Sequence, residues 1–193
     1  AGIDTAICFN TSIYLNGQGG VKYKWTPALG LNNDSIPYPI ATPLITTTYT
    51  LQITDYYKCT AIDSVVVTVN PNPNNIITGK QIICLQDIDT ISVIGGLSYV
   101  WNTGDSTDKI IVSPQHNTKY IVTATNEFGC IDIDSITVKV NPLPYTATYS
   151  NYDTICSNQE LILAAYGGYA YVWSEQGLTG QMITFQPQTS IDE

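Results

Sequence analysis

The chain has 193 residues and a formal net charge of −9, and charged residues form only 12% of the sequence. With seven lysines and no arginine it lacks the side chains for a phosphate-binding groove or a reader of base edges, so nucleic acid is not an expected partner. No apolar run approaches the roughly 18 to 20 residues that span a bilayer, so membrane insertion is not expected either. Abundant Thr, Tyr, Val and Ile, with few strong helix formers, favour an all-β fold.

Alternating apolar and polar residues in the first 71 positions show the period of a strand with one buried face. We expect a short strand at residues 13–15, a second at 21–25 that ends on Trp25, and a later one at 49–53 that begins with Tyr49. Valines at 65–69 predict the last strand. Asn70-Pro71 then ends the unit, because proline cannot donate a hydrogen bond to a sheet.

The same series of elements recurs along the chain. A cysteine is followed by Gly-Gly and then Tyr-x-Trp three times, with 17 residues from cysteine to tryptophan in each copy: Cys8, Gly19-Gly20 and Trp25; Cys84, Gly95-Gly96 and Trp101; Cys156, Gly167-Gly168 and Trp173. The second half recurs once, as Tyr49, Cys59 and Asn70-Pro71, then Tyr120, Cys130 and Asn141-Pro142. Such self-similarity predicts three small domains at residues 1–71, 72–142 and 143–193, the third truncated at its C-terminal end.

Each unit is expected to form an immunoglobulin-like β-sandwich. Short strands with a turn signal every 8 to 12 residues or so fit a sandwich of about seven strands, with a tryptophan on an early strand and a tyrosine on a late one. The predicted core residues are Trp25, Tyr49, Trp101, Tyr120 and Trp173. Proline-rich junctions predict short semi-rigid hinges, which gives tandem domains in a linear array.

The motifs resemble a known family. Asp-Thr-x-Ile-Cys, Gly-Gly, Tyr-x-Trp-Thr-Pro-Ala-x-Gly-Leu, Cys-Thr-Ala-x-Asp-Ser-Val and Val-Asn-Pro are similar to the Ig-like or PKD-like repeats of giant Bacteroidota cell-surface proteins. Such repeats occur in gliding-motility adhesins of the SprB type and in other cargo of type IX secretion. The second and third units depart from the pattern after the tryptophan. The resemblance implies a secreted or outer-membrane-attached protein of cell adhesion.

The five cysteines predict disulfides within domains. Cys8 would pair with Cys59 and Cys84 with Cys130, while the partner of Cys156 would lie beyond the end of the sequence. Each bridge would close a loop of about 50 residues, worth roughly 4 kcal/mol, and would indicate an oxidising compartment. Free buried thiols are the alternative.

Seven of the twelve aspartates precede a serine or threonine that is followed by an apolar residue or threonine. This pattern resembles the acceptor motif of Bacteroidota O-glycosylation and implies a glycoprotein. The alternative is that Asp-Ser and Asp-Thr begin turns and strands well. The implied acceptors are Thr5, Ser35, Ser64, Thr90, Ser106, Ser135 and Thr154.

Two Asp-x-Asp pairs, Asp87 with Asp89 and Asp132 with Asp134, place carboxylates two residues apart on one side of a strand. They could chelate calcium, although charges that deter edge-to-edge pairing of sheets are the simpler interpretation. With one histidine and no Cys-x-x-Cys, zinc is not expected. We therefore expect no cofactor, with calcium as the alternative.

The sequence predicts no enzyme. Its sole imidazole, His116, falls in an expected exposed turn, and the Gly-Gly pairs fall between strands rather than in a phosphate loop. Tyr38, Tyr56 and Tyr57 could form a sugar-binding platform, but strand packing is the simpler interpretation.

We therefore expect a structural or adhesive stalk segment, without catalysis, of a large secreted or surface-anchored repeat protein. Its partners would be the neighbouring repeats, with surface polysaccharide or other cell-surface proteins as further candidates. Two alternatives are open: a carbohydrate-binding or spacer module of an exported hydrolase, and a subunit of an extracellular filament.

Overall fold

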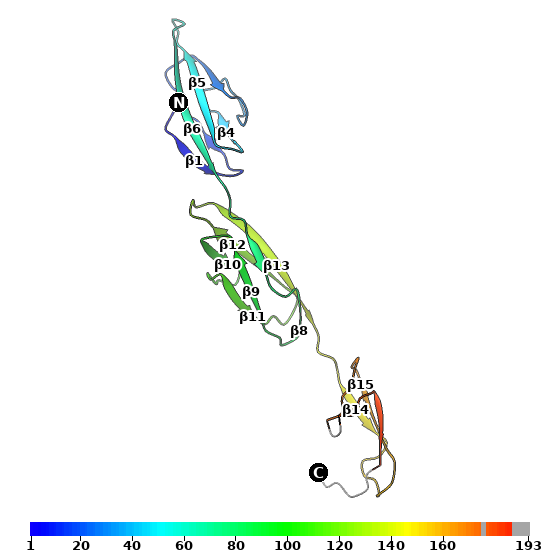
Figure 1. Ribbon diagram of the computed structural model, residues 1–193. Helices are drawn as coiled ribbons and strands as arrows, with labels where there is room; N and C mark the ends of the chain where they lie inside the picture. Colours follow the sequence, from blue (N-terminus) through cyan, green and yellow to red (C-terminus); the bar gives the residue numbers. More distant parts are fainter. Residues whose placement is uncertain (175–176, 187–193) are drawn as a thin grey trace. The chain divides into compact units, whose positions relative to one another are not determined.

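The computed structural model describes residues 1–174 and 177–186. The regular elements of the described residues are all β-strands, β1 to β16. The chain divides into two compact units, Ala1–Val140 and Asn141–Glu193 (Figure 1). Within the described ranges, no helix is long and apolar enough to cross a lipid bilayer. The predicted all-β class is thus confirmed.

The first repeat forms two sheets. A four-stranded sheet has the order β1-β6-β5-β3, and a two-stranded sheet pairs β2 with β4. The strands are β1 (Thr5–Cys8), β2 (Ile13–Tyr14), β3 (Lys22–Thr26), β4 (Ile40–Ala41), β5 (Thr47–Thr54) and β6 (Thr60–Asn70). β5 and β6 form a long antiparallel hairpin, and β1 runs parallel to the end of β6, with Cys8 opposite Asn70 (Figure 1).

Trp25 and Tyr49 lie at the centre of the first repeat, both with no exposed surface. They pack with alternate apolar residues of β5 and β6, among them Leu51 and Val67. Their polar atoms are satisfied, because the Trp25 Nε1–H donates to the carbonyl oxygen of Ile36 at 3.0 Å and the Tyr49 hydroxyl to that of Leu29 at 3.0 Å. Burying such a ring is worth roughly 4 to 6 kcal/mol as an upper bound.

The second repeat has the same plan. Its sheets have the orders β10-β12-β13-β8 and β11-β9-β7, which pack as an immunoglobulin-like β-sandwich. The strands are β7 (Ile76–Thr78), β8 (Ile82–Cys84), β9 (Asp89–Ile94), β10 (Ser98–Trp101), β11 (Lys109–Val112), β12 (Thr118–Thr125) and β13 (Ile131–Asn141). Trp101 and Tyr120 are buried in a core of its own, with Ile91, Val122 and Val138.

The predicted domain boundary after residue 71 falls inside the first compact unit, between these two separate hydrophobic clusters. The three predicted ranges stay a prediction. The last residues of the third range, 187–193, lie outside the described residues.

The second unit contains a three-stranded sheet of order β14-β15-β16, formed by β14 (Ala147–Ser150), β15 (Leu161–Tyr166) and β16 (Met182–Phe185). The side chain of Trp173, a predicted core residue, is only half-buried, and its Nε1–H donates to the carbonyl oxygen of Gly180 at 3.0 Å. The reason is that the described part of this unit holds no counterpart of the long hairpins β5–β6 and β12–β13, whose tyrosine and aliphatic residues cover the other tryptophans.

The Gly-Gly turn before β10 has a second role besides chain reversal. Gly95 has a φ of 110°, which favours glycine, and a Cβ at this position would lie 2.1 Å from the backbone oxygen of Asn74. The junction that follows Pro71 therefore passes directly against this turn. A side chain at residue 95 would push the junction away.

Candidate functional site

A disulfide joins the first repeat to the second. Cys8 at the end of β1 is bonded to Cys130, which directly precedes β13, with Cα atoms 5.5 Å apart and a sequence separation of 122. Beside it, the Asn126 side-chain Nδ2–H donates to the carbonyl oxygen of Pro71 at 2.7 Å. We call this group, Cys8, Cys130, Asn126 and Pro71, the joint.

The predicted pairs, Cys8 with Cys59 and Cys84 with Cys130, are wrong. Cys8 lies opposite Asn70, the last residue of β6, whereas Cys59 directly precedes Thr60, the first. An 11-residue strand separates them, about 35 Å at roughly 3.3 Å per residue, while a disulfide requires Cα atoms within about 7 Å.

Cys84 and Cys130 are separated in the same way. The N–H of Lys139, near the end of β13, donates to the carbonyl oxygen of Gln81 directly before β8, whereas Cys130 precedes the start of β13. Cys59, Cys84 and Cys156 are exposed free thiols. The sequence did hold a signal against the predicted pairs. The run of alternating residues that leads from Cys59 or Cys130 to the following Asn-Pro is too long for its two ends to meet.

The turn that carries Cys130 is organised by Asn126. Its side-chain Oδ1 accepts hydrogen bonds from the backbone N–H groups of Phe128 and Cys130, both at 3.0 Å. The backbone N–H of Asn126 donates to the Cys130 carbonyl oxygen at 3.0 Å. Gly129, at a φ of 77°, completes the reversal. The side chain of Asn126 thus stabilises the turn through its Oδ1 and binds the junction at Pro71 through its Nδ2.

On the side of the first repeat, Cys8 of the joint is followed by a tight turn after β1. The N–H of Phe9 donates to the carbonyl oxygen of Asn70 at 2.9 Å, and that of Thr11 to the carbonyl oxygen of Cys8 at 3.0 Å. Cys8 is half-buried and Cys130 has no exposed surface. The bond is therefore shielded from solvent, which limits the access of a reducing thiol.

Three of the four carboxylates considered as calcium ligands accept hydrogen bonds from backbone N–H groups. Asp89 is buried and its Oδ2 accepts the N–H of Lys80 at 2.7 Å, whereas the Oδ2 of Asp87 accepts the N–H of Cys84 at 3.0 Å. Asp134 accepts the N–H of Ser135 at 2.7 Å. The structure shows no group of three or more metal-liganding side chains among the residues it describes. The expectation of no cofactor, with calcium at these pairs, Asp132 included, as the alternative, stays a prediction.

The predicted acceptors of O-glycosylation lie at the surface. Thr5 is half-buried and the other six, Ser35, Ser64, Thr90, Ser106, Ser135 and Thr154, are exposed. Asp63 and Asp134 each accept the N–H of the serine that follows, at equivalent points of β6 and β13. Accessible hydroxyls suit either interpretation, and glycosylation stays a prediction.

The remaining candidate residues are not gathered into one site. His116 is exposed, and its carbonyl oxygen accepts the hydroxyl of Thr118 at 2.7 Å. Tyr38, expected to pack on a strand, is 53% exposed. Tyr56 and Tyr57, each 85% exposed, lie in the turn before Cys59 with their rings edge to face, so strand packing does not explain them.

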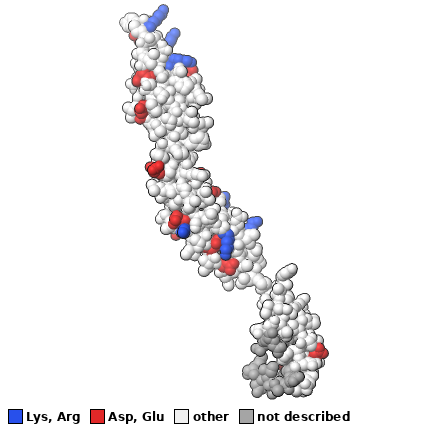
Figure 2. All heavy atoms as spheres, viewed as in Figure 1, with Lys and Arg blue, Asp and Glu red and all other residues white. Residues whose placement is uncertain are grey.

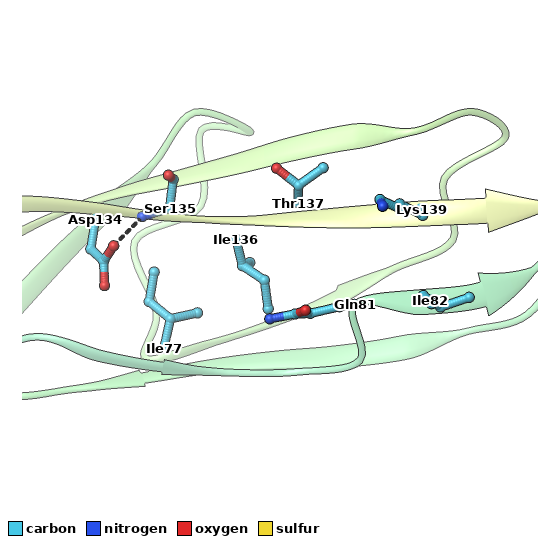
Figure 3. Close-up of a pocket in the computed structure, with 8 residues that line it drawn as sticks. All are labelled: Ile77, Gln81, Ile82, Asp134, Ser135, Ile136, Thr137 and Lys139. Atoms are coloured by element: carbon cyan, nitrogen blue, oxygen red, sulfur yellow. Dashed lines mark hydrogen bonds between the residues drawn. The ribbon is translucent and has the colours of Figure 1, made fainter.

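A shallow depression lies in the second repeat where the chain crosses from one sheet to the other between β7 and β8 (Figure 3). The depression is lined by side chains of β13 and of the chain around the crossing. The lining residues are Ile77, Gln81, Ile82, Asp134, Ser135, Ile136, Thr137 and Lys139. Asp134 is already bonded to the N–H of Ser135. The depression is explained by the sheet switch itself.

Charged side chains form no extended patch on the face drawn in Figure 2, where most of the surface is uncharged. One ion pair joins Lys24 to Asp34, and the hydrogen bond from Lys24 lowers the pKa of the Asp34 carboxyl below its ordinary value. Both partners are at the surface, so this pair contributes little to stability.

No protein-family model and no curated protein matches the sequence. Among solved structures, the chain is similar to an amphioxus IgVJ-C2 molecule at 10% identity and a TM-score of 0.32, over 69% of this chain and 99% of that one. It is similar to murine CEACAM1b at 12% and 0.30, over 70% and 96%, and to extracellular cadherin domains 3–6 of protocadherin gamma B2 at 8% and 0.35, over 85% and 54%.

Proposed function

We propose that this chain is a structural, non-catalytic segment of a secreted or cell-surface protein, in which successive immunoglobulin-like domains are locked to one another. The observation that carries the proposal is the Cys8–Cys130 bond, which joins two repeats instead of stapling one. A disulfide between domains restricts their relative motion and leaves each core unchanged. That property suits a spacer or stalk that bears load.

The location and the broader role rest on two further arguments. A disulfide persists in oxidising compartments, which supports export from the cytoplasm. The repeat motifs resemble those of giant Bacteroidota surface proteins, and on that resemblance we infer a type IX cargo attached at the outer membrane that serves adhesion. The segment would hold a binding region away from the cell.

Distance measurements between the first two repeats test this function. Spin labels are placed on non-cysteine side chains, at exposed Tyr56 in the first repeat and exposed Ile111 in the second, through an unnatural amino acid. We expect a narrow distance distribution in the oxidised chain and a broader one after reduction. A distribution that is broad in both states would contradict a locked spacer. The matched control is the Cys8→Ser variant, which should be broad without reductant.

A further inference from the structure

The turn that holds Cys59 in the first repeat repeats the geometry of the turn that holds bonded Cys130. Asp55 Oδ1 accepts the N–H groups of Tyr57 and Cys59, both at 2.8 Å, and its own N–H donates to the Cys59 carbonyl oxygen at 2.9 Å. Lys58, with a φ of 67°, takes the place of Gly129. The exposed thiol of Cys59 therefore lies in a turn with the same hydrogen bonds as the turn of Cys130, which is already bonded to another repeat.

The surroundings of Cys84 likewise match those of bonded Cys8. Cys84 ends β8, which lies beside the end of β13, and Asn141-Pro142 follows there as Asn70-Pro71 follows beside Cys8. The Asp87 N–H donates to the Cys84 carbonyl oxygen at 3.0 Å, as Thr11 does to Cys8. Each of the two repeats thus presents a turn cysteine at one end of its last strand and a strand-end cysteine at the other.

We propose that the 55–59 turn is a docking surface for another repeat of this same kind, and that Cys59 forms a disulfide there with a strand-end cysteine equivalent to Cys84. The inference deepens the proposed function, because it extends the joint from one pair of repeats to a series. The Cys8–Cys130 bond is the independent observation, because it joins a strand-end cysteine of one repeat to a turn cysteine of another.

The bond forms by thiol–disulfide exchange with a small-molecule disulfide, for which oxidised glutathione serves. The Cys59 thiolate attacks one glutathione sulfur and expels one glutathione thiolate. The Cys84 thiolate of a second copy then attacks the Cys59 sulfur of this mixed disulfide and expels the other. Two protein thiols are oxidised, one glutathione disulfide is reduced to two thiols, and the two protons pass to those thiols.

One difference between the two turns gives a sharp test. Asn126 donates an amide N–H to the carbonyl oxygen of Pro71, whereas the carboxylate of Asp55 has no hydrogen to donate to an equivalent carbonyl. Asp55→Asn restores the donor and removes a charge. One added hydrogen bond should raise the yield of the joined product about three- to ten-fold.

The experiment incubates the 193-residue chain at high concentration in a glutathione redox buffer, resolves the products without reductant and maps the linked peptides by mass spectrometry. We expect covalent dimers and longer chains linked mainly from Cys59 to Cys84, their loss in Cys59→Ser, and a higher yield in Asp55→Asn. Equal amounts of Cys59–Cys59, Cys84–Cys84 and mixed links would overturn the proposal, as would an unchanged yield in Asp55→Asn. Either failure would leave the Cys8–Cys130 bond, and so the proposed function, standing.

Discussion

At the scale of single residues, the tryptophans of the three repeats differ in what covers them. Trp25 and Trp101 are buried at 0% and 2% exposure with their indole N–H groups bonded, whereas Trp173 is half-buried. The same motif therefore has unequal energetic weight, because the burial of a ring depends on strands far along the chain.

Trp25→Ala should lower the free energy of unfolding of the first repeat by about 3 to 5 kcal/mol, through lost burial and a cavity. Trp173→Ala is the matched control and should cost less than half of that. Thermal unfolding followed by circular dichroism measures both. Equal losses in the two variants would contradict the difference in burial.

Alkaline pH should destabilise the fold through Tyr49 and Tyr120. Burial raises the pKa of both hydroxyls above the ordinary value of 10.0. Below that value both states are neutral, and above it the unfolded tyrosines ionise first, so stability is lost as pH rises through the raised pKa. Denaturant unfolding between about pH 8 and 11 measures this. Tyr49→Phe should flatten the fall, whereas Tyr57→Phe, at an exposed position, should not.

At the scale of elements, the Gly-Gly turn and the junction act together. Gly95 has a positive φ and the Asn74 backbone against it, while Gly104 has a φ of 94° and a Cβ there would meet nothing within 4 Å. Both glycines therefore share the cost that a positive φ imposes on a side chain, and only Gly95 adds the cost of crowding against the Asn74 backbone.

Gly95→Ala should therefore be more destabilising than Gly104→Ala, by about 1 to 3 kcal/mol, because only the first must displace the junction. Chemical denaturation of both variants, with Cys8–Cys130 intact, gives the difference. Equal costs would show that the Asn74 contact does not matter.

At the scale of the whole molecule, the joint constrains more chain than a bridge within one domain would. Cys8 and Cys130 are 122 residues apart, and a closed loop of that size is worth up to about 5 kcal/mol in lost unfolded-state entropy.

A variant with Cys59, Cys84 and Cys156 changed to serine keeps only the joint, and a variant that also lacks Cys8 and Cys130 removes it. We expect the second to unfold at a temperature several degrees lower by calorimetry, with the transitions of the two repeats moving apart. Identical melting curves would mean that the bond adds nothing to the stability of either repeat.

Much of the architecture follows from the amino-acid sequence alone. Strand periodicity, the recurrent Tyr-x-Trp and the Asn-Pro endings are local patterns, so the all-β class and the burial of Trp25, Tyr49, Trp101 and Tyr120 could be predicted without coordinates. The exposure of Trp173 was not predictable in this way, because its cover must come from strands distant in sequence.

The partners of the cysteines were decided by tertiary structure. Spacing placed two cysteines in each of the first two repeats, but the strand between them keeps them at opposite ends, and the junction brings the turn of one repeat to the strand end of another. A disulfide depends on the distance between two Cα atoms, and that distance is set by strand length and by the path of the chain between domains.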